Sequence, residues 1–316
     1  MSGFLARRLG QSLVLLVIVS MVGFAILHLA PGGPMSQFAS GSDMTQEDLD
    51  RIAEQLGLNR PLPVQYAEWF WRMLQGDWGR SYRDGEAVLH VIGSHLGATL
   101  QLMLTATLLA IFLGVAIGTL GAIRRHSVFD TLATVGAMVA LSIPTFWFGL
   151  VAIYLFSVWL GWLPSGNRST PGDGSALDLL RHLILPAMVL ALVETAVWSR
   201  FMRSSMLDVV NQDYIRTARA KGVPEGRILL RHAFRNAALP MITVLGLQLP
   251  TLLGGALVTE TVFTWPGMGR LFLDSISYRD YPVVMGILMF SAMLVLMGSL
   301  LADLLHAVAD PRIRLG

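Results

Sequence analysis

Residues 204–240, SSMLDVVNQDYIRTARAKGVPEGRILLRHAFRNAALP, form a polar and basic island between two apolar stretches. A charged segment of this length cannot lie in the hydrocarbon of a bilayer, so it lies in water on one side. Its arginines favour the cytoplasmic side. Helix-forming residues flank Gly222-Val223-Pro224, which predicts two short helices joined by a turn. Small residues would let another protein approach closely, so we interpret the island as a docking site for a cytoplasmic partner; they are Ala218, Ala220 and Gly222.

The composition indicates a protein that crosses the membrane several times. Of 316 residues, 54% are hydrophobic and only 14% are charged, with a mean hydropathy of +0.59. Soluble domains carry about a quarter charged residues. The chain has no cysteine, which excludes disulfides, thiolate metal sites and a cysteine nucleophile.

Six apolar stretches predict an all-α protein with six membrane spans, since a bilayer requires about 20 apolar residues. The first begins like a signal peptide, but it is too long for one and is followed by a poor cleavage site, so we expect an uncleaved helix. The predicted spans are 9–30, 97–123, 129–163, 183–202, 237–258 and 283–305.

The basic residues are distributed unevenly between the two sides that six spans would define. One side holds Arg7, Arg8, Arg124, Arg125, the basic residues of the island, Arg312 and Arg314, whereas the short loops on the other side hold Arg168, Arg181, Arg270 and Arg279. This bias places both termini in the cytoplasm. The predicted domains are residues 1–30 with the first span, an outer insertion at 31–96, and a core at 97–316 that contains the cytoplasmic loop 204–236.

The outer insertion predicts two short helices. Thr45 or Asp43 can cap the first, and Gly57 can stop it. Pro61 starts the second, which is rich in aromatic residues. Such residues suit the membrane interface, and a sugar- or peptide-binding platform is the alternative; they are Tyr66, Trp69, Phe70, Trp71 and Trp78.

Four residues are candidates for the pathway or gate of a transporter. Pro144 and Pro250 lie within predicted spans, where proline kinks a helix. Glu194 lies at or near the membrane interior and should face protein or water, as a gate or as a packing residue. Glu260 lies in the last outer loop, at 259–281.

The chain carries no phosphate loop and no hydrolase motif. There is no G-x-x-x-x-G-K-[ST], no H-E-x-x-H and no G-x-S-x-G, so the chain cannot hydrolyse ATP by that route and a membrane-embedded enzyme is disfavoured. Transport work must then draw on an ion gradient or on a partner ATPase. A gradient-driven secondary transporter usually has inverted repeats and midplane ionisable residues, and only Glu194 is a strong candidate. The large cytoplasmic loop favours the partner ATPase.

Several long motifs resemble one family. DYIRTARAKGVPEGRILLRHAFRNAALP strongly resembles the cytoplasmic coupling loop of ABC-transporter permeases, and most closely that of the first permease subunit of dipeptide and oligopeptide importers. Further matching motifs are FLARRLGQSLVLLVIVSMVGFAILHLAPGGP, LGLNRPLPVQYAEWFWRMLQGDWGRS, SIPTFWFGL, FMRSSMLDVVNQDYIRTARAKG, GLQLPTLLGGALVTETVFTWPGMGRLF and DPRIR. The resemblance covers nearly the whole chain and implies a type I ABC importer permease.

The family's coupling loop follows the pattern Glu-Ala-Ala, three residues, Gly. Arg216, Thr217, Ala218 and Gly222 stand at these positions, so the glutamate and the first alanine are replaced, which puts any contact of that glutamate in doubt. The resemblance implies that this loop docks in a groove of an ATPase subunit; the residues are Tyr214, Arg216, Thr217, Ala218, Arg219, Ala220, Lys221 and Gly222. The basic ones could pair with acids across the interface.

The resemblance also implies partners in the bacterial inner membrane and on both sides of it. They are a second homologous permease subunit, two ATP-binding subunits that hydrolyse ATP with Mg²⁺, and a periplasmic or lipid-anchored solute-binding protein that docks on the outer segments. No cofactor, metal or nucleic acid is expected on this chain, and membrane lipid surrounds it. The substrate stays open among dipeptides, oligopeptides, nickel chelates, glutathione and opines.

Overall fold

The computed structural model describes residues 2–29, 33, 35, 45–254 and 256–309. Most of them are helical, and β pairing among them is confined to one bridge between Arg80 and Ala87. The alternative cap Asp43 and the terminal DPRIR motif lie outside the described residues.

Four helices in the described part are long and apolar enough to cross a membrane. They are α1 (Ser2–Leu29), α5 (Val88–Ile123), α8 (Ala176–Val210) and α15 (Tyr281–Ala309). Three of them, α1, α5 and α8, extend well beyond the predicted apolar stretches. Helix α5, for example, begins at Val88 rather than at residue 97.

The predicted third span is broken rather than kinked. Helix α6 (Val128–Ser142) and the pair α7 (Thr145–Ala152) and η1 (Ile153–Trp159), the latter a π-helix, meet at an angle of 103°. Pro144 is the residue that precedes α7. Because a proline ring disfavours helical backbone in the residue before it, Ile143 is extended, with ψ of 128°. The pair therefore counts as a fifth span only if its two arms are taken together.

The predicted fifth span corresponds to α12 (Leu239–Gly254), which has 16 residues. At 1.5 Å per residue it is about 24 Å long, which is shorter than the roughly 30 Å of a hydrocarbon core. The six predicted stretches are thus all represented by helices, but only four are unbroken spans of full length in the described residues.

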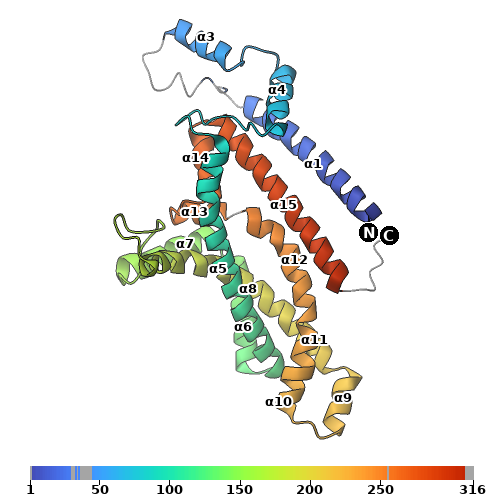
Figure 1. Ribbon diagram of the computed structural model, residues 1–316. Helices are drawn as coiled ribbons and strands as arrows, with labels where there is room; N and C mark the ends of the chain where they lie inside the picture. The colour runs from blue at the N-terminus through green and yellow to red at the C-terminus, as the bar shows by residue number, and fades with distance from the viewer. Residues whose placement is uncertain (1, 30–32, 34, 36–44, 255, 310–316) are drawn as a thin grey trace.

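Helices α5 and α8 pack side by side along much of their length and form the centre of the molecule (Figure 1). Their close approach depends on two glycines of α5. A Cβ atom at Gly114 would overlap the Trp198 side chain, and one at Gly118 would overlap the carbonyl oxygen of Ser199. Trp198 is fully buried there.

Helix α1 lies along α15 at the edge of this bundle (Figure 1). Gly23 packs against the Leu288 and Met285 side chains, and Arg8 Nη2 donates to Asp303 Oδ1 at 3.1 Å. The beginning of α1 and the end of α15 therefore lie on the same side, as the prediction for the two termini requires.

The outer insertion contains the two predicted helices, α3 (Gln46–Gln55) and α4 (Leu62–Leu74). Thr45 caps α3 in a reciprocal capping box with Asp48. Gly57, at φ of +69°, follows the end of α3. Three of the predicted aromatic residues of α4 contact one another, namely Tyr66, Trp69 and Phe70. Tyr66 and Trp69 also contact the ring of Phe24 on α1, and the Tyr66 hydroxyl lies 2.8 Å from Ser20 Oγ.

Asp280 fastens the end of this insertion to the outer end of α15. It is 3% exposed and accepts hydrogen bonds from Ser81 Oγ at 2.5 Å and from the Tyr82 amide at 3.0 Å. Burial and the nearby Asp280 carboxylate raise the pKa of Tyr82 to about 12.

The outer loop of the core adds two helices, α13 (Leu257–Val262) and α14 (Met268–Ser277).

The α5–α8 contact predicts opposite effects for two glycine substitutions on the same helix. Gly118→Ala should lower the free energy of unfolding by about 1–3 kcal/mol, since the methyl group forces the helix backbones apart. Gly93→Ala adds its methyl group in open space and should be neutral or stabilising by about 0.5–1 kcal/mol. Thermal unfolding of the detergent-purified protein measures both, and equal effects at the two positions would contradict the proposed packing.

Candidate functional site

The cytoplasmic loop consists of two short helical segments joined by a tight turn, as predicted. Helix α8 ends at Val210, and α9 (Asp213–Ala220) follows it. Gly222 then adopts a φ of +74°, a left-handed conformation that favours glycine. Pro224 precedes α10 (Glu225–Arg227), the π-helix η2 (Ile228–Phe234) and α11 (Arg235–Ala237). Figure 1 shows α9 and α10 at the lower tip of the molecule, opposite α3 and α4.

Buried apolar side chains join this loop to the α5–α8 core. Ile215 of α9 and Ile228 of η2 are both fully buried, and they belong to the same hydrophobic cluster as Met202 and Met206 of α8. Each fully buried isoleucine contributes about 1.5–3 kcal/mol relative to exposure. Ser205 Oγ of α8 also donates to the Ala237 carbonyl oxygen at 2.9 Å. The loop is therefore packed on the membrane helices as a continuation of their core.

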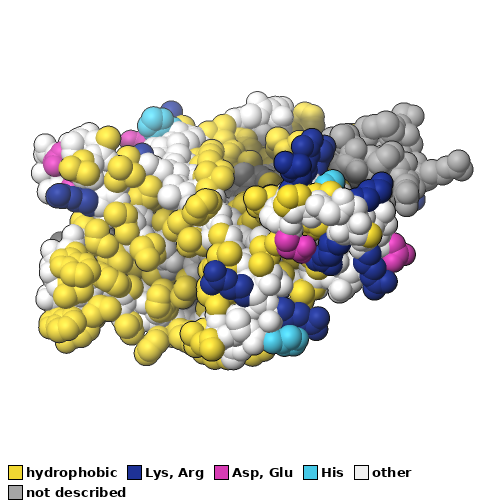
Figure 2. Space-filling view, turned by 90° about the horizontal axis from the view of Figure 1, so that it is seen from below, with side chains coloured by type: hydrophobic (Ala, Val, Ile, Leu, Met, Phe, Trp, Pro, Cys, Tyr) yellow, Lys and Arg dark blue, Asp and Glu magenta, His cyan; other side chains and the backbone are white. Residues whose placement is uncertain are grey.

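The exposed surface of the loop is basic. Tyr214, Arg216, Thr217, Ala220 and Lys221 all have exposed side chains. Seen from below, Lys and Arg side chains gather on the half of the molecule that carries the loop, while hydrophobic side chains dominate the other half (Figure 2).

Two of the predicted contact residues are placed differently from the expectation. Ala218 is only half-exposed and packs against the hydrophobic cluster, so it helps to hold α9 in place. Arg219 donates from Nη2 and Nε to Glu225 at 2.7 and 3.2 Å, across the turn at Gly222. This guanidinium lowers the pKa of Glu225. Arg219 thus already has an acidic partner within the loop, and it stabilises the turn.

A second ion pair links α6 to α8 just above the loop. Arg203 donates to the two carboxylate oxygens of Asp130 at 2.6 and 2.8 Å, and the amide of His126 donates to the same carboxylate at 3.0 Å. The Asp130 side chain is 6% exposed. Bidentate pairs of this kind fix relative orientation as well as adding energy. The loop and the broken helix α6 are therefore both fastened to the cytoplasmic end of α8.

The predicted pathway residue Glu194 lies at the contact of α5 and α8. Its carboxylate accepts a hydrogen bond from the Thr107 hydroxyl at 3.0 Å, and its side chain is half-buried. Pro144 lies exposed at the break between α6 and α7. Pro250 lies within α12, and its side chain is outside the described part. A role of these three residues in the pathway stays a prediction.

Glu260 lies in α13 and is buried, although the sequence placed it in an outer loop. It has no exposed surface, and its carboxylate accepts hydrogen bonds from the Thr99 hydroxyl and the Gly269 amide, each at 2.7 Å. A Cβ atom at Gly267 would overlap this carboxylate. Glu260 thus ties α13 and α14 to α5 in the described structure, and a role of Glu260 in the pathway also stays a prediction.

The sequence interpretation missed the Asp130–Arg203 pair and the Asp280 anchor. Ser127, three residues before Asp130, signals a helix start, and its hydroxyl does accept from the Asp130 amide. That local signal does not identify Arg203, which is 73 residues further along the chain. Only the packing of α6 on α8 brings the two side chains together.

Comparisons with known proteins identify relatives over the whole chain. A family described as the inner membrane component of binding-protein-dependent transport systems matches residues 106–315, and the N-terminal part of such components matches residues 1–103. The oligopeptide transport system permease protein AppB of Bacillus subtilis is 46% identical over 99% of both chains. The dipeptide transport system permease protein DppB of Escherichia coli is 39% identical over 98% of both chains.

A solved structure shares the fold. The MetNI methionine ABC transporter in an inward facing conformation matches with a TM-score of 0.55 at 16% identity, and the match covers 70% of this chain and 96% of that chain. At this identity the match concerns the fold alone.

The two kinds of ion pair at the cytoplasmic end should differ in their effect on stability. Asp130→Asn leaves the part-buried Arg203 without its bidentate acceptor and should lower the free energy of unfolding by about 1–3 kcal/mol. Asp213→Asn removes an exposed partner 3.5 Å from Arg216 and should change it by less than about 1 kcal/mol. Thermal unfolding of both variants measures these effects. An Asp130→Asn variant as stable as the unmodified protein would contradict a stabilising role for the ion pair between α6 and α8.

Proposed function

The chain belongs to the family of binding-protein-dependent transport system inner membrane components, and from this premise we propose that it imports peptides. It is the permease subunit of an ABC importer, and the ATPase activity of such importers lies in separate subunits. The peptide class rests on the names of full-length relatives, which are oligopeptide and dipeptide permeases at 39–46% identity. Family membership decides against a gradient-driven carrier and against a membrane-embedded enzyme.

In this proposal the loop at 204–236 contacts the ATPase subunits, and their conformational change on ATP binding and hydrolysis moves it. The observation that supports it is the continuity of the loop with the core, because Ile215 and Ile228 are fully buried in the cluster that contains Met202 of α8. A partner that moves α9 would move α8 with it, since a packed core transmits displacement. The exposed basic residues around Gly222 suit an acidic groove on an ATPase subunit.

The proposed assembly contains a second homologous permease subunit, two ATP-binding subunits and a solute-binding protein outside the membrane. ATP and Mg²⁺ are bound by the ATP-binding subunits, and no cofactor is assigned to this chain. Closure of the ATPases would draw the two coupling loops together and turn the spans outward, as rigid-body motion of packed elements. The broken helix at Pro144 and the prolines of α12 are the proposed pivots. The insertion and the segment 259–281 form the proposed outer docking surface.

A substitution at the turn of the loop tests this proposal. Gly222→Trp places a bulky side chain on the exposed turn and should lower ATP-dependent peptide uptake at least about tenfold, while membrane insertion stays intact. Gly222→Asn is the matched control, since asparagine tolerates the left-handed conformation and adds little bulk. Uptake and coupled ATP hydrolysis are measured in proteoliposomes that contain the complete importer.

Normal transport by Gly222→Trp would contradict a docking role for the loop. An equal loss in the Gly222→Asn variant would place the requirement in the backbone turn itself, and would also count against contact with a partner at this surface.

A further inference from the structure

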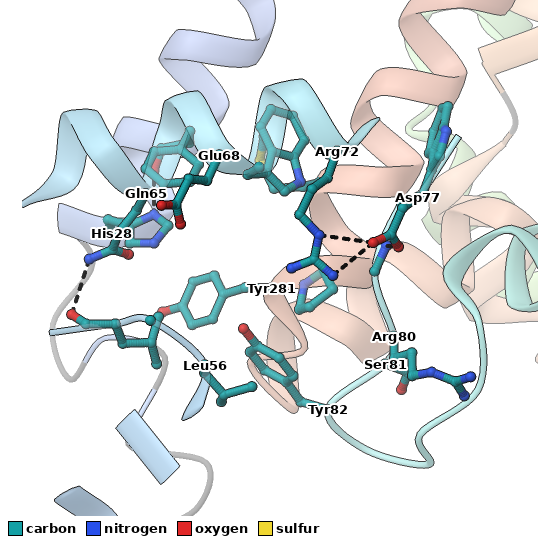
Figure 3. A pocket seen from close by; sticks show the side chains of 18 of the residues that line it. His28, Leu56, Gln65, Glu68, Arg72, Asp77, Arg80, Ser81, Tyr82 and Tyr281 are labelled. Carbon is teal, nitrogen blue, oxygen red and sulfur yellow. Dashed lines mark hydrogen bonds and ion pairs between the residues drawn. The ribbon is translucent and has the colours of Figure 1, made fainter. Parts of the chain in front are cut away.

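A cavity of about 650 Å³ lies at the outer end of the molecule, between α4, the segment 77–82 and the outer ends of α1 and α15 (Figure 3). This volume is within the range of about 300–1,000 Å³ that is usual for small-molecule sites. The cavity is separate from the cytoplasmic loop and from the α5–α8 contact that the proposed function uses.

Two opposite charges face this cavity from one helix. Glu68 and Arg72 are one turn apart on α4, and Figure 3 shows both side chains directed toward the same hollow, with Tyr281 and Tyr82 across from them. On a helix, residues at this spacing have Cβ atoms about 5–6 Å apart. The cavity therefore offers a carboxylate and a guanidinium to one ligand at the same time.

Both charges have partners that leave part of their binding capacity unused. Arg60 Nη1 donates to Glu68 Oε1, while Arg72 donates to Asp77 from Nε at 2.9 Å and contacts it through Nη2 at 2.7 Å. Within the described part of the chain these contacts use Glu68 Oε1 and Arg72 Nε and Nη2, so Glu68 Oε2 and Arg72 Nη1 can still bind a ligand. All four side chains are about half-exposed, and exposed ion pairs hold weakly, so a ligand can share or displace them at little cost.

The walls of the cavity are aromatic and comparatively rigid. The rings of Trp69 and Phe24 contact each other at a tilt in the cluster that joins α4 to α1, and the buried Tyr281 lies at the start of α15. Gln65 donates to the carbonyl oxygens of Leu58 and Arg60 at 3.0 and 2.7 Å, which fixes the chain between α3 and α4. Apolar walls with a few oriented polar groups are the usual composition of a ligand site.

We propose that this cavity binds a short peptide as a zwitterion, with the ammonium group at Glu68 and the carboxylate at Arg72. The cavity is lined by two acidic and two basic side chains, so an anion alone would meet Glu68 and Asp77 and a cation alone would meet Arg72 and Arg80, whereas a zwitterion suits both signs of charge. The termini of an extended dipeptide are roughly 7 Å apart, which fits charges one helical turn apart. The aromatic walls would contact the side chains of the peptide. The assignment rests on the proposed peptide function and adds a binding site on the permease itself.

Equilibrium binding of a tritiated Ala-Leu dipeptide tests the proposal. The complete importer without its solute-binding protein is placed in nanodiscs of phosphatidylglycerol, so that no zwitterionic lipid is present. Glu68→Gln and Arg72→Gln should each weaken binding at least about tenfold. Glu47→Gln and Arg51→Gln, which make the same charge changes at an exposed pair on α3, should leave it unchanged.

Blocked peptides identify which charge each residue recognises. The N-acetylated dipeptide should bind weakly and lose its sensitivity to Glu68→Gln, while the C-amidated dipeptide should lose its sensitivity to Arg72→Gln. Absence of saturable dipeptide binding, or equal losses in the α3 control variants, would overturn the proposal. So would binding of glycerophosphoethanolamine in place of the dipeptide, because the cavity would then be a lipid headgroup site.

Uptake in the same preparation separates this inference from the proposed function. If peptide uptake with the solute-binding protein present is normal but no dipeptide binds in its absence, only the cavity assignment fails. If no peptide is transported under any condition, the proposed function fails.

Discussion

The close contact between α5 and α8 is the feature on which the rest of the structure depends. Gly114 and Gly118 let the two helix backbones approach, and the fully buried Trp198, Met202 and Met206 fill the space beside them. In lipid the hydrophobic effect does not drive helices together, so close packing of small residues has to do so. The cytoplasmic loop is packed on the same cluster, so the packed core would transmit a displacement of the loop to α8.

In the outer half of the protein, buried acidic side chains join neighbouring elements by hydrogen bonds. Glu260 joins α13 and α14 to α5, and Asp280 joins the insertion to α15. Asp178 at the start of α8 accepts from the amide and hydroxyl of Thr170 at 2.7 and 2.8 Å, which fastens the preceding loop. Buried carboxylates are stable only when several donors satisfy them, and each of these has at least two. The outer surface is therefore built on fixed anchors, although it consists mostly of loops and short helices.

The two ends of the molecule are suited to different tasks. The cytoplasmic end presents a compact basic loop continuous with the core, as a subunit that is moved by another protein requires. The outer end presents a cavity with both signs of charge and aromatic walls, which suits recognition of a small solute. Between them, the broken helix α6–α7 is fastened to α8 by the Asp130–Arg203 pair. A single movement of α8 would thus reach both the loop and the broken helix.

The sequence by itself determined the features that depend on local chemistry or on composition. The membrane class follows from composition. The apolar stretches, a cap at Thr45 or Asp43 and the turn at Gly222 and Pro224 follow from residues within a few positions of one another. Only the tertiary structure decided the 103° break at Pro144, the inward side of Ala218, the burial of Glu260 and the pairing of Asp130 with Arg203. Glu260 meets Thr99 across 161 positions, and no local pattern encodes a hydrogen bond over that separation. A proline signals a disturbed helix, but the angle at which the chain continues is set by the helices against which it packs.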